Sequence, residues 1–358
     1  MADRYWILGT GTWDSTTTTN WSASSGGAGG ASVPTASDNV FFDANSNVGV
    51  TAFTVTMANS PRVCNDFTAS GLDGAMTLAG LGIALTVSGS LTFQATNFTR
   101  TYTGRTTFNA TTTGKTITTN GASLVQVAIN GVGGKWTLGS ALNSTSIVFL
   151  QNGTLDLNGL TLTTGIQFQT ALGTKNLTFN GATLVCTAAT TTAFNNLNPT
   201  NFTTTAGTGV GTISMTAATA KTFVGGGSTF NCTLNQGDAG ALSIEGSNTF
   251  SNITNTYKSN GATSILFTAG TTSTFTDWNA SGESTRLLTI GSVTAASHTL
   301  SKASGTVSSD FLSISRSTAT GGAGWYAGAN STNGGNNSGW IFTAPPSVTA
   351  TGNFLVFF

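Results

Sequence analysis

The sequence predicts an all-β protein folded as a single-stranded parallel β-helix, or β-solenoid, of about a dozen coils. A recurring phrase, a low content of charged residues and a scarcity of helix-forming residues lead to this prediction. The phrase is an apolar residue, a polar residue, a second apolar residue, any residue and glycine, and it occupies residues 85–89, 155–159, 177–181 and 242–246. Its glycines stand 70, 22 and 65 residues apart, close to whole multiples of a unit of about 22.

Each copy of the phrase predicts one short strand followed by a turn. Alternating apolar residues give a strand with one buried face, and the glycine lets the chain turn through a left-handed conformation. A single unit cannot bury its own apolar face, so the units are expected to stack into a continuous core. At about 4.8 Å per coil, the stack would form a rod on the order of 60 Å long.

A second phase of the repeat predicts more than one strand per coil. Apolar pairs recur at 242/244, 265/267 and 288/290, and Thr-Phe pairs recur at 229–230, 249–250 and 274–275. Two or three strands per coil indicate a triangular or flattened cross-section. Residues 94–150 keep the period poorly, and a β-sandwich or a barrel, which are also built from short strands, is the alternative.

Charged residues make up only 7% of the chain, against roughly 25% in an ordinary globular domain, and the formal net charge is zero. No basic stripe is present, so neither nucleic acid nor an anionic membrane surface is an expected partner. Stacked strands place equivalent side chains about 4.8 Å apart, where like charges repel but Thr and Asn can hydrogen-bond in ladders. Thr and Val are abundant while Glu and Lys are scarce, which disfavours helix, and 22 Phe residues supply a core.

No stretch approaches the ~18 to 20 apolar residues of a membrane span, and the start of the chain lacks the basic and apolar regions of a secretory signal. We therefore expect no membrane insertion, and assembly in the cytoplasm of a host cell, as for virion components released by lysis. Cys64, Cys186 and Cys232 show no CxxC spacing and no nearby His. This pattern predicts small buried core residues rather than a disulfide or a metal site.

The chain is expected to have three segments. Residues 1–45 form a Trp/Gly-rich N-terminal cap or attachment module, residues 46–320 the parallel β-helix, and residues 321–358 a terminal coil, a closing turn and a hydrophobic C-terminal tail. An open solenoid end exposes an unpaired edge and an open core, so large rings over the first coil would act as a plug. The candidates for this plug, and alternatively for contacts in an assembly, are Trp6, Trp13 and Trp21.

The tail carries large apolar residues close together, namely Phe354, Leu355, Phe357 and Phe358. Exposed to solvent, they would promote aggregation, so they are expected to pack on the rod or on a partner chain. Cyclic symmetry would let three such tails bury one another. We therefore expect a homotrimer with these residues as assembly contacts.

Several short motifs occur together near the N-terminus: Tyr5-Trp6, residues 9–14 (GTGTWD), residues 20–22 (NWS), Pro34 and residues 38–43 (DNVFFD). They resemble the opening module of bacterial and phage parallel β-helix proteins, among them autotransporter-type passenger domains and tailed-phage structural proteins. Residues 321–342 resemble the closing turn of the same group. The resemblance implies a virion structural protein of the parallel β-helix type, and proteins of this group commonly form trimers.

The residues able to do chemistry do not form a catalytic set. A glycosidase needs two carboxylates about 5 to 9.5 Å apart, and the rod offers Asp156, Asp238, Glu245, Asp277, Glu283 and Asp310. Glu245 and Asp277 are 32 residues apart, and Asp277 and Asp310 are 33 apart, so neither interval is a whole number of coils. His298 is the only histidine and no nucleophile motif surrounds any Ser. Residues 38–47 offer oxygen atoms to calcium, but their spacing matches no loop motif. The sequence predicts no enzyme, no cofactor and no metal.

The expected function is a non-enzymatic structural protein on the exterior of a tailed-phage virion, foremost a capsid decoration (cement) protein that contacts the major capsid protein. The close alternative is a tail fibre or spike, which contacts a tail protein and binds a host receptor or glycan. Its candidate contacts are the aromatic residues Trp278, Tyr257 and Trp325. A coil corner with the indole turned inward is the other interpretation of Trp278. A fibre normally has a long N-terminal attachment part, whereas only residues 1–45 precede this rod. A secreted bacterial adhesin is a third alternative.

Overall fold

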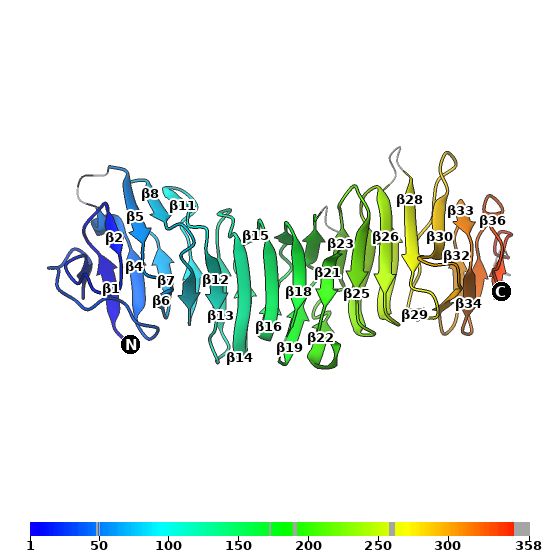
Figure 1. The fold of residues 1–358 in the computed structure, drawn as a ribbon, viewed down its shortest axis with the longest axis horizontal. Coiled ribbons are helices and arrows are strands. Elements are labelled where there is room, and N and C mark those ends of the chain that lie inside the picture. Colours follow the sequence, from blue (N-terminus) through cyan, green and yellow to red (C-terminus); the bar gives the residue numbers. More distant parts are fainter. Residues whose placement is uncertain (48, 50, 172, 189–191, 258–261, 347–358) are drawn as a thin grey trace, which may run out of the picture.

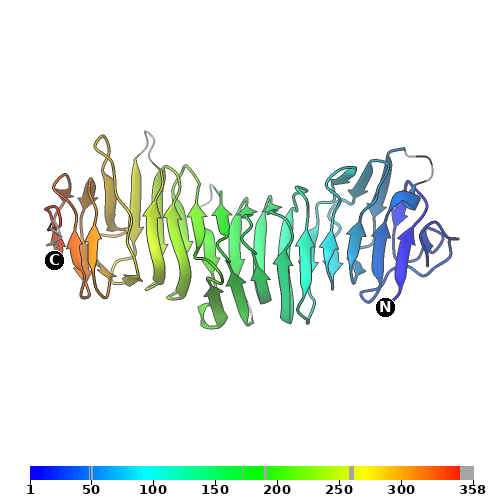
Figure 2. The same cartoon turned by 180° about the vertical axis from the view of Figure 1, so that it is seen from behind.

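The computed structural model describes residues 1–47, 49, 51–171, 173–188, 192–257 and 262–346. Within them the chain is an all-β parallel solenoid of about 12 turns, with 2% helix. Figure 1 shows an elongated rod whose coils follow one another from the N-terminal to the C-terminal end, and Figure 2 shows the same stack from behind. The predicted fold class is confirmed, and the sandwich and barrel alternatives are wrong. In the described ranges, no helix has the length and apolarity to cross a membrane.

Each coil passes through up to three strand positions, which we name faces A, B and C in chain order. Face A comprises β6 (Arg62–Cys64), β9 (Leu85–Val87), β12 (Arg105–Phe108), the first parts of β14 (Gln126–Leu138) and β16 (Ile147–Asp156), β18 (Gln167–Thr170), β21 (Thr192–Asn196), β24 (Lys221–Val224), β26 (Gly240–Glu245), β28 (Thr263–Phe267), β30 (Leu288–Ser292), β33 (Leu312–Ile314) and β36 (Thr332–Asn333). These strands pair in parallel from one coil to the next.

Face B begins the rod and comprises β1 (Asp3–Trp6), β4 (Asn39–Phe42), β7 (Phe67–Ala69), β10 (Leu91–Thr92), β13 (Lys115–Thr118), the second parts of β14 and β16, β19 (Lys175–Thr178), β22 (Phe202–Thr205), the first parts of β25 (Thr229–Gln236) and β27 (Thr249–Asn255), β29 (Thr272–Phe275), β31 (His298–Ser301) and β34 (Ser317–Thr320). Its strands are also parallel, and side chains rather than a backbone ladder join β22 to β25.

Face C comprises β2 (Gly11–Trp13), β5 (Phe53–Met57), β8 (Met76–Ala79), β11 (Phe98–Arg100), β15 (Leu142–Ser144), β17 (Leu162–Thr164), β20 (Thr183–Cys186), β23 (Gly211–Met215), the second parts of β25 and β27, β32 (Thr306–Ser308), β35 (Gly324–Tyr326) and β37 (Trp340–Ile341). The remaining elements are β3 (Trp21–Ser22) and the 3-10 helices η1 (Ala44–Ser46) and η2 (Pro199–Asn201). Three faces per coil confirm the predicted cross-section of two or three strands.

The recurring phrase lies on two different faces. Residues 85–87 and 242–244 belong to face A, whereas Leu155 and Leu177 are direct partners on face B. The interpretation of the 70- and 65-residue intervals as three units of one column is therefore wrong, and only the 22-residue step from Leu155 to Leu177 is one coil. Coil length varies, because Trp136 pairs with Leu155 after 19 residues and Leu177 pairs with Thr204 after 27.

The phrase recurs on both faces because each ends in a tight turn. Gly159, Gly181 and Gly246 have φ values of +74°, +81° and +95°, which glycine adopts without strain. Gly89 serves differently, since a Cβ built there would lie 2.0 Å from Oδ1 of Asp66 on the coil below. The prediction of a left-handed turn is thus confirmed at three of the four glycines.

The region of poor periodicity, residues 94–150, is stacked as regularly as the rest. The period is lost in sequence because β14 runs around a coil corner, and its pairing with β16 shifts between Ile129 and Lys135. The extra residues of this bulge fill the corner, and the buried residues on either side stay in register.

Two aromatic ladders fill the middle of the rod. On face A, Phe194 stacks between Phe168 and Phe223, with ring centroids 5.4 and 4.5 Å apart. On face B the Phe residues of three successive Thr-Phe pairs stack at 5.3 and 6.0 Å. The pairs noted in the sequence at 229–230, 249–250 and 274–275 are therefore stacked neighbours in the core.

A tryptophan cluster closes the N-terminal end. Trp21 packs edge-on against Trp6 and Trp13, with centroids 5.1 and 5.4 Å away, and all three are at most 1% exposed. β3 pairs antiparallel with β1 and covers the edge of the first parallel strand. The predicted plug is confirmed, and the alternative role of these residues as assembly contacts is wrong because no partner can reach them.

A second tryptophan cluster, which the sequence did not lead us to predict, lies at the other end. Trp278, Trp325 and Trp340 pack edge-on, with centroid distances of 5.7, 6.2 and 5.1 Å. Strand pairing continues across both expected segment boundaries, through β4 with β7 and through β32 with β35. The cap, the rod and the closing turn are therefore stacked on one another as a single ladder.

Candidate functional surfaces

Two of the three aromatic residues expected to contact a glycan are buried. Trp278 is 2% exposed and Trp325 is 1% exposed, both inside the C-terminal tryptophan cluster. The indole N–H of Trp278 donates to the Ser309 hydroxyl oxygen at 3.1 Å. The expectation that these rings face a ligand is wrong, and the inward interpretation of Trp278 is confirmed.

The remaining predicted contacts are less accessible to test. Tyr257 is half-buried, and the Arg286 guanidinium lies 6.0 Å from the centre of its ring. Phe354, Leu355, Phe357 and Phe358 lie outside the described residues. Their assembly role stays a prediction.

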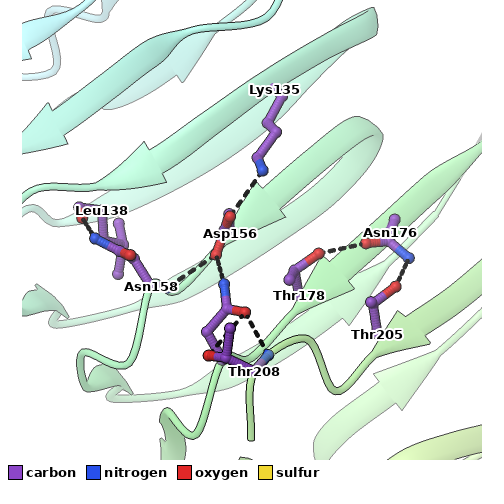
Figure 3. A network of polar contacts seen from close by, with 9 residues as sticks. Lys135, Leu138, Asp156, Asn158, Asn176, Thr178, Thr205 and Thr208 are labelled. Atoms are coloured by element: carbon purple, nitrogen blue, oxygen red, sulfur yellow. Dashed lines mark hydrogen bonds and ion pairs between the residues drawn. The ribbon is translucent and has the colours of Figure 1, made fainter.

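The best-ordered carboxylate, Asp156, holds the middle of face B together (Figure 3). Its Oδ2 atom lies 2.8 Å from Nζ of Lys135, one coil below. Its Oδ1 atom accepts hydrogen bonds from the backbone N–H of Asn158 and from the side-chain amide of Asn180, each at 2.9 Å. Asn180 in turn accepts from the backbone N–H of Thr208 at 3.0 Å. This network ties together turns of successive coils and leaves Asp156 only 5% exposed.

The other carboxylates weighed as catalytic candidates have different neighbours. Asp277 lies 3.9 Å from Nζ of Lys302, and its side chain is 58% exposed. Asp310 accepts from the backbone and the side chain of Asn330 at 3.0 and 2.7 Å. Burial alone would raise the pKa of Asp310, but these hydrogen bonds outweigh it and hold the pKa below its usual range. Both are thereby suited to coil corners as ionised structural groups.

His298 is fully buried beneath face B. Its ring stacks on Phe267 with centroids 4.8 Å apart, and Nδ1 shares a hydrogen bond of 2.8 Å with the hydroxyl of Ser292. Burial lowers the pKa of His298 to about 4, so the ring is neutral at pH 7. This Ser–His pair is closed to solvent on the histidine side, which fits a structural role.

All three cysteines are free and buried, which confirms them as core residues. Burial raises the pKa of each thiol, to about 12 in Cys186. In the described part of the chain, no group of three or more His, Cys, Asp or Glu side chains is placed to hold a metal ion.

The deepest surface feature lies across face B and its corner with face A. One hollow of about 440 Å³ is lined by Pro199, Thr200, Phe202, Thr203, Gly226, Gly227, Ser228, Thr229 and Asn231. A neighbouring hollow of about 190 Å³ is lined by Val132, Gly133, Gly134, Gly153, Thr154, Thr174, Lys175, Asn176 and Thr203. Thr203 borders both, so we treat them together as the face-B groove. Sequence reasoning missed it, because its walls come from turns that obey no repeat.

A long turn shapes the groove. The 27-residue coil leading into β22 carries η2, and this region protrudes from the lower edge of the rod in Figures 1 and 2. Lys175 fixes the turn from beneath: its Nζ donates to the carbonyl oxygens of Gly173 at 2.8 Å and of Asn198 at 3.1 Å. Lys175 is 1% exposed, and burial lowers its pKa. The groove is therefore a preformed feature held by core contacts.

No protein-family model, no curated protein and no solved structure matches this chain. The assignment of a function therefore rests on its own residues and surfaces.

Proposed function

We propose that the protein is a non-enzymatic structural rod on the exterior of a tailed-phage virion, where it serves as a capsid decoration (cement) protein. The observation that carries the proposal is the closure of the rod at both ends by buried tryptophan clusters. Closed ends oppose end-to-end growth and leave the long lateral faces for partners. A rod that binds sideways can span the boundary between neighbouring shell subunits.

The composition of the lateral faces supports this role. Only 7% of the residues are charged, so a flank rich in Thr, Ser and Asn loses less hydration free energy on contact than a charged one. Its polar groups can exchange water for hydrogen bonds with a partner, as in ordinary protein interfaces. The proposed partners are the major capsid protein and two further copies of this chain.

The proposed role is tested on particles of the phage that encodes the chain. Antibody-gold labelling of intact particles should decorate the shell, and particles lacking the gene should release their DNA at a lower temperature. Gold confined to the tail would favour the tail fibre or spike. Absence from purified particles would contradict any virion role and favour the secreted adhesin.

The proposed homotrimer has its own test. Full-length protein should sediment as a trimer at micromolar concentration, and deletion of residues 353–358 should yield the monomer. A monomer in both cases would contradict assembly through the tail.

A tail fibre or spike that binds a glycan remains the second candidate. The face-B groove favours it, since the two buried tryptophans cannot take the role expected of them. Both candidates place the working surface on the side of the rod.

A further inference from the structure

We propose that the face-B groove binds a neutral oligosaccharide lying along the rod. The proposal holds for a decoration protein and for a tail fibre alike, so it does not depend on the virion role above. Its larger hollow, about 440 Å³, falls within the ~300–1,000 Å³ range of small-molecule sites.

The groove exists because the face-B ladder opens between β22 and β25. Asn231 bridges the opening: its side-chain amide donates to the Thr204 carbonyl oxygen and its backbone N–H donates to the Thr204 hydroxyl, both at 2.7 Å. The hollow between the two strands is thus held open by side chains. Lys175, through Asn198, fixes the wall that η2 provides. Little reorganisation would be needed to admit a ligand.

The groups that line the groove match a polyhydroxylated ligand. Thr and Ser hydroxyls and Asn amides both donate and accept, as sugar hydroxyls do, and five of the lining residues are Thr. Val132 (69% exposed) and Pro199 add apolar surface for the C–H faces of a sugar ring. Lys175 is the one charged residue among those that line the two hollows, and its ammonium group already donates to two carbonyl oxygens. This balance favours a neutral ligand over an acidic one.

An extended peptide fits the groove less well. Strand addition needs a free backbone edge, yet the strands beneath the smaller hollow, β14, β16, β19 and β22, already pair with one another. At the opening beside β25, Asn231 occupies the Thr204 carbonyl, and the Thr204 hydroxyl donates to the Thr229 carbonyl at 3.4 Å. Side-chain hydroxyls and amides are what the groove offers.

The test blocks the groove with one bulky side chain. Thr203 is exposed and borders both hollows, so Thr203→Trp should fill them. Thr205→Trp is the matched control, because Thr205 is equally exposed on the same strand and both hydroxyls accept from Asn176, but Thr205 lines neither hollow. The probes are neutral hexasaccharides of glucose, mannose and N-acetylglucosamine, with a galacturonic acid oligomer and a Gly-Ser peptide as comparison ligands. Binding is measured by calorimetry on the full chain.

The expected result is binding of at least one neutral hexasaccharide to the wild type and to Thr205→Trp, with affinity about tenfold lower or worse for Thr203→Trp. Thr229→Trp, on the opposite wall, repeats the test if the first variant fails to fold. The proposal is overturned if no neutral hexasaccharide binds at millimolar concentration, if Thr203→Trp binds as well as the control, or if only the acidic oligomer or the peptide binds.

Discussion

Phe194 illustrates how single residues hold the stack together. It is fully buried, stacked between two Phe rings of the neighbouring coils, and in edge contact with Phe230 at 5.7 Å. A solenoid coil gains nearly all its stability from its two neighbours. Each such ring therefore contributes to two coil interfaces at once.

Replacing this ring tests the contribution. Phe194→Ala should lower the free energy of unfolding by about 3–5 kcal/mol, because the cavity lies between coils that cannot collapse onto it. Urea unfolding followed by circular dichroism measures it. Asn195→Ala, on the outer side of the same strand, is the control and should change stability by less than about 0.5 kcal/mol. Equal effects of the two changes would mean that the ring is not in the core.

His298 predicts a pH dependence of stability. Its pKa is lowered by burial from 6.5 to about 4, so between these values the unfolded chain binds a proton that the folded chain does not. The free energy of unfolding should therefore fall as the pH falls from about 6.5 to about 4, by roughly 2–3 kcal/mol.

The variant His298→Phe isolates this effect. A Phe ring keeps the stacking on Phe267 but cannot titrate, and Ser292 still donates to the carbonyl oxygen of Arg316. Stability curves of the two proteins should converge as the pH falls through the window, since the carboxylates titrate equally in both. Parallel curves would show that His298 takes no part in acid destabilisation.

At the scale of the coil, the turns rather than the strands vary. The inner residues keep register while the number of residues per turn changes, so one coil takes 19 residues and another 27. Glycines permit this variation in two ways: some adopt a left-handed conformation, and others lie too close to the neighbouring coil for any Cβ. Gly153 does both, since its φ is +84° and a Cβ would lie 2.4 Å from the Gly131 carbonyl oxygen.

A pair of glycine variants separates the two demands. Gly270 has a φ of +74° but open space around it, so Gly270→Ala should cost only the left-handed penalty, about 1–2 kcal/mol. Gly153→Ala meets the same penalty and a backbone clash, and should cost about 3 kcal/mol or more. Thermal melts of both variants decide the matter. A smaller loss at Gly153 than at Gly270 would contradict the close packing of these turns.

The strands could be predicted from the sequence because their signal is local. Apolar alternation at Leu155 and Leu177 marks an inner surface whatever lies around it, and glycine marks the turn that follows. The face on which a strand lies depends on the length of the preceding turn, which leaves no periodic trace. For the same reason the inward orientation of Trp325 and the groove beside Thr203 could not be predicted: corner geometry and a break between two strands produced them.

At the scale of the whole molecule, two closed ends define a rod of fixed length. The N-terminal plug was predictable, since Trp6, Trp13 and Trp21 crowd one short segment. Its C-terminal counterpart was not, because Trp278, Trp325 and Trp340 are spread over three coils and meet only through stacking. The proposed functions all place partners along the sides of this rod, so they depend on the coils stacking in the register described.

Paired cysteines test that register most directly. Thr154 and Asn176 are partners on adjacent coils of face B, and Asn176 and Thr203 are the next pair. Adjacent strands lie about 4.8 Å apart, within the Cα separation of a disulfide, whereas strands two coils apart do not. The native thiols do not compete, because each is buried with a raised pKa.

The measurement is the number of free thiols in denaturant after mild oxidation, together with the mass of the chain. We expect Thr154→Cys/Asn176→Cys to form an intramolecular disulfide, and Thr154→Cys/Thr203→Cys to keep both thiols free. No disulfide in the first pair, or equal disulfide formation in the two, would contradict the parallel solenoid.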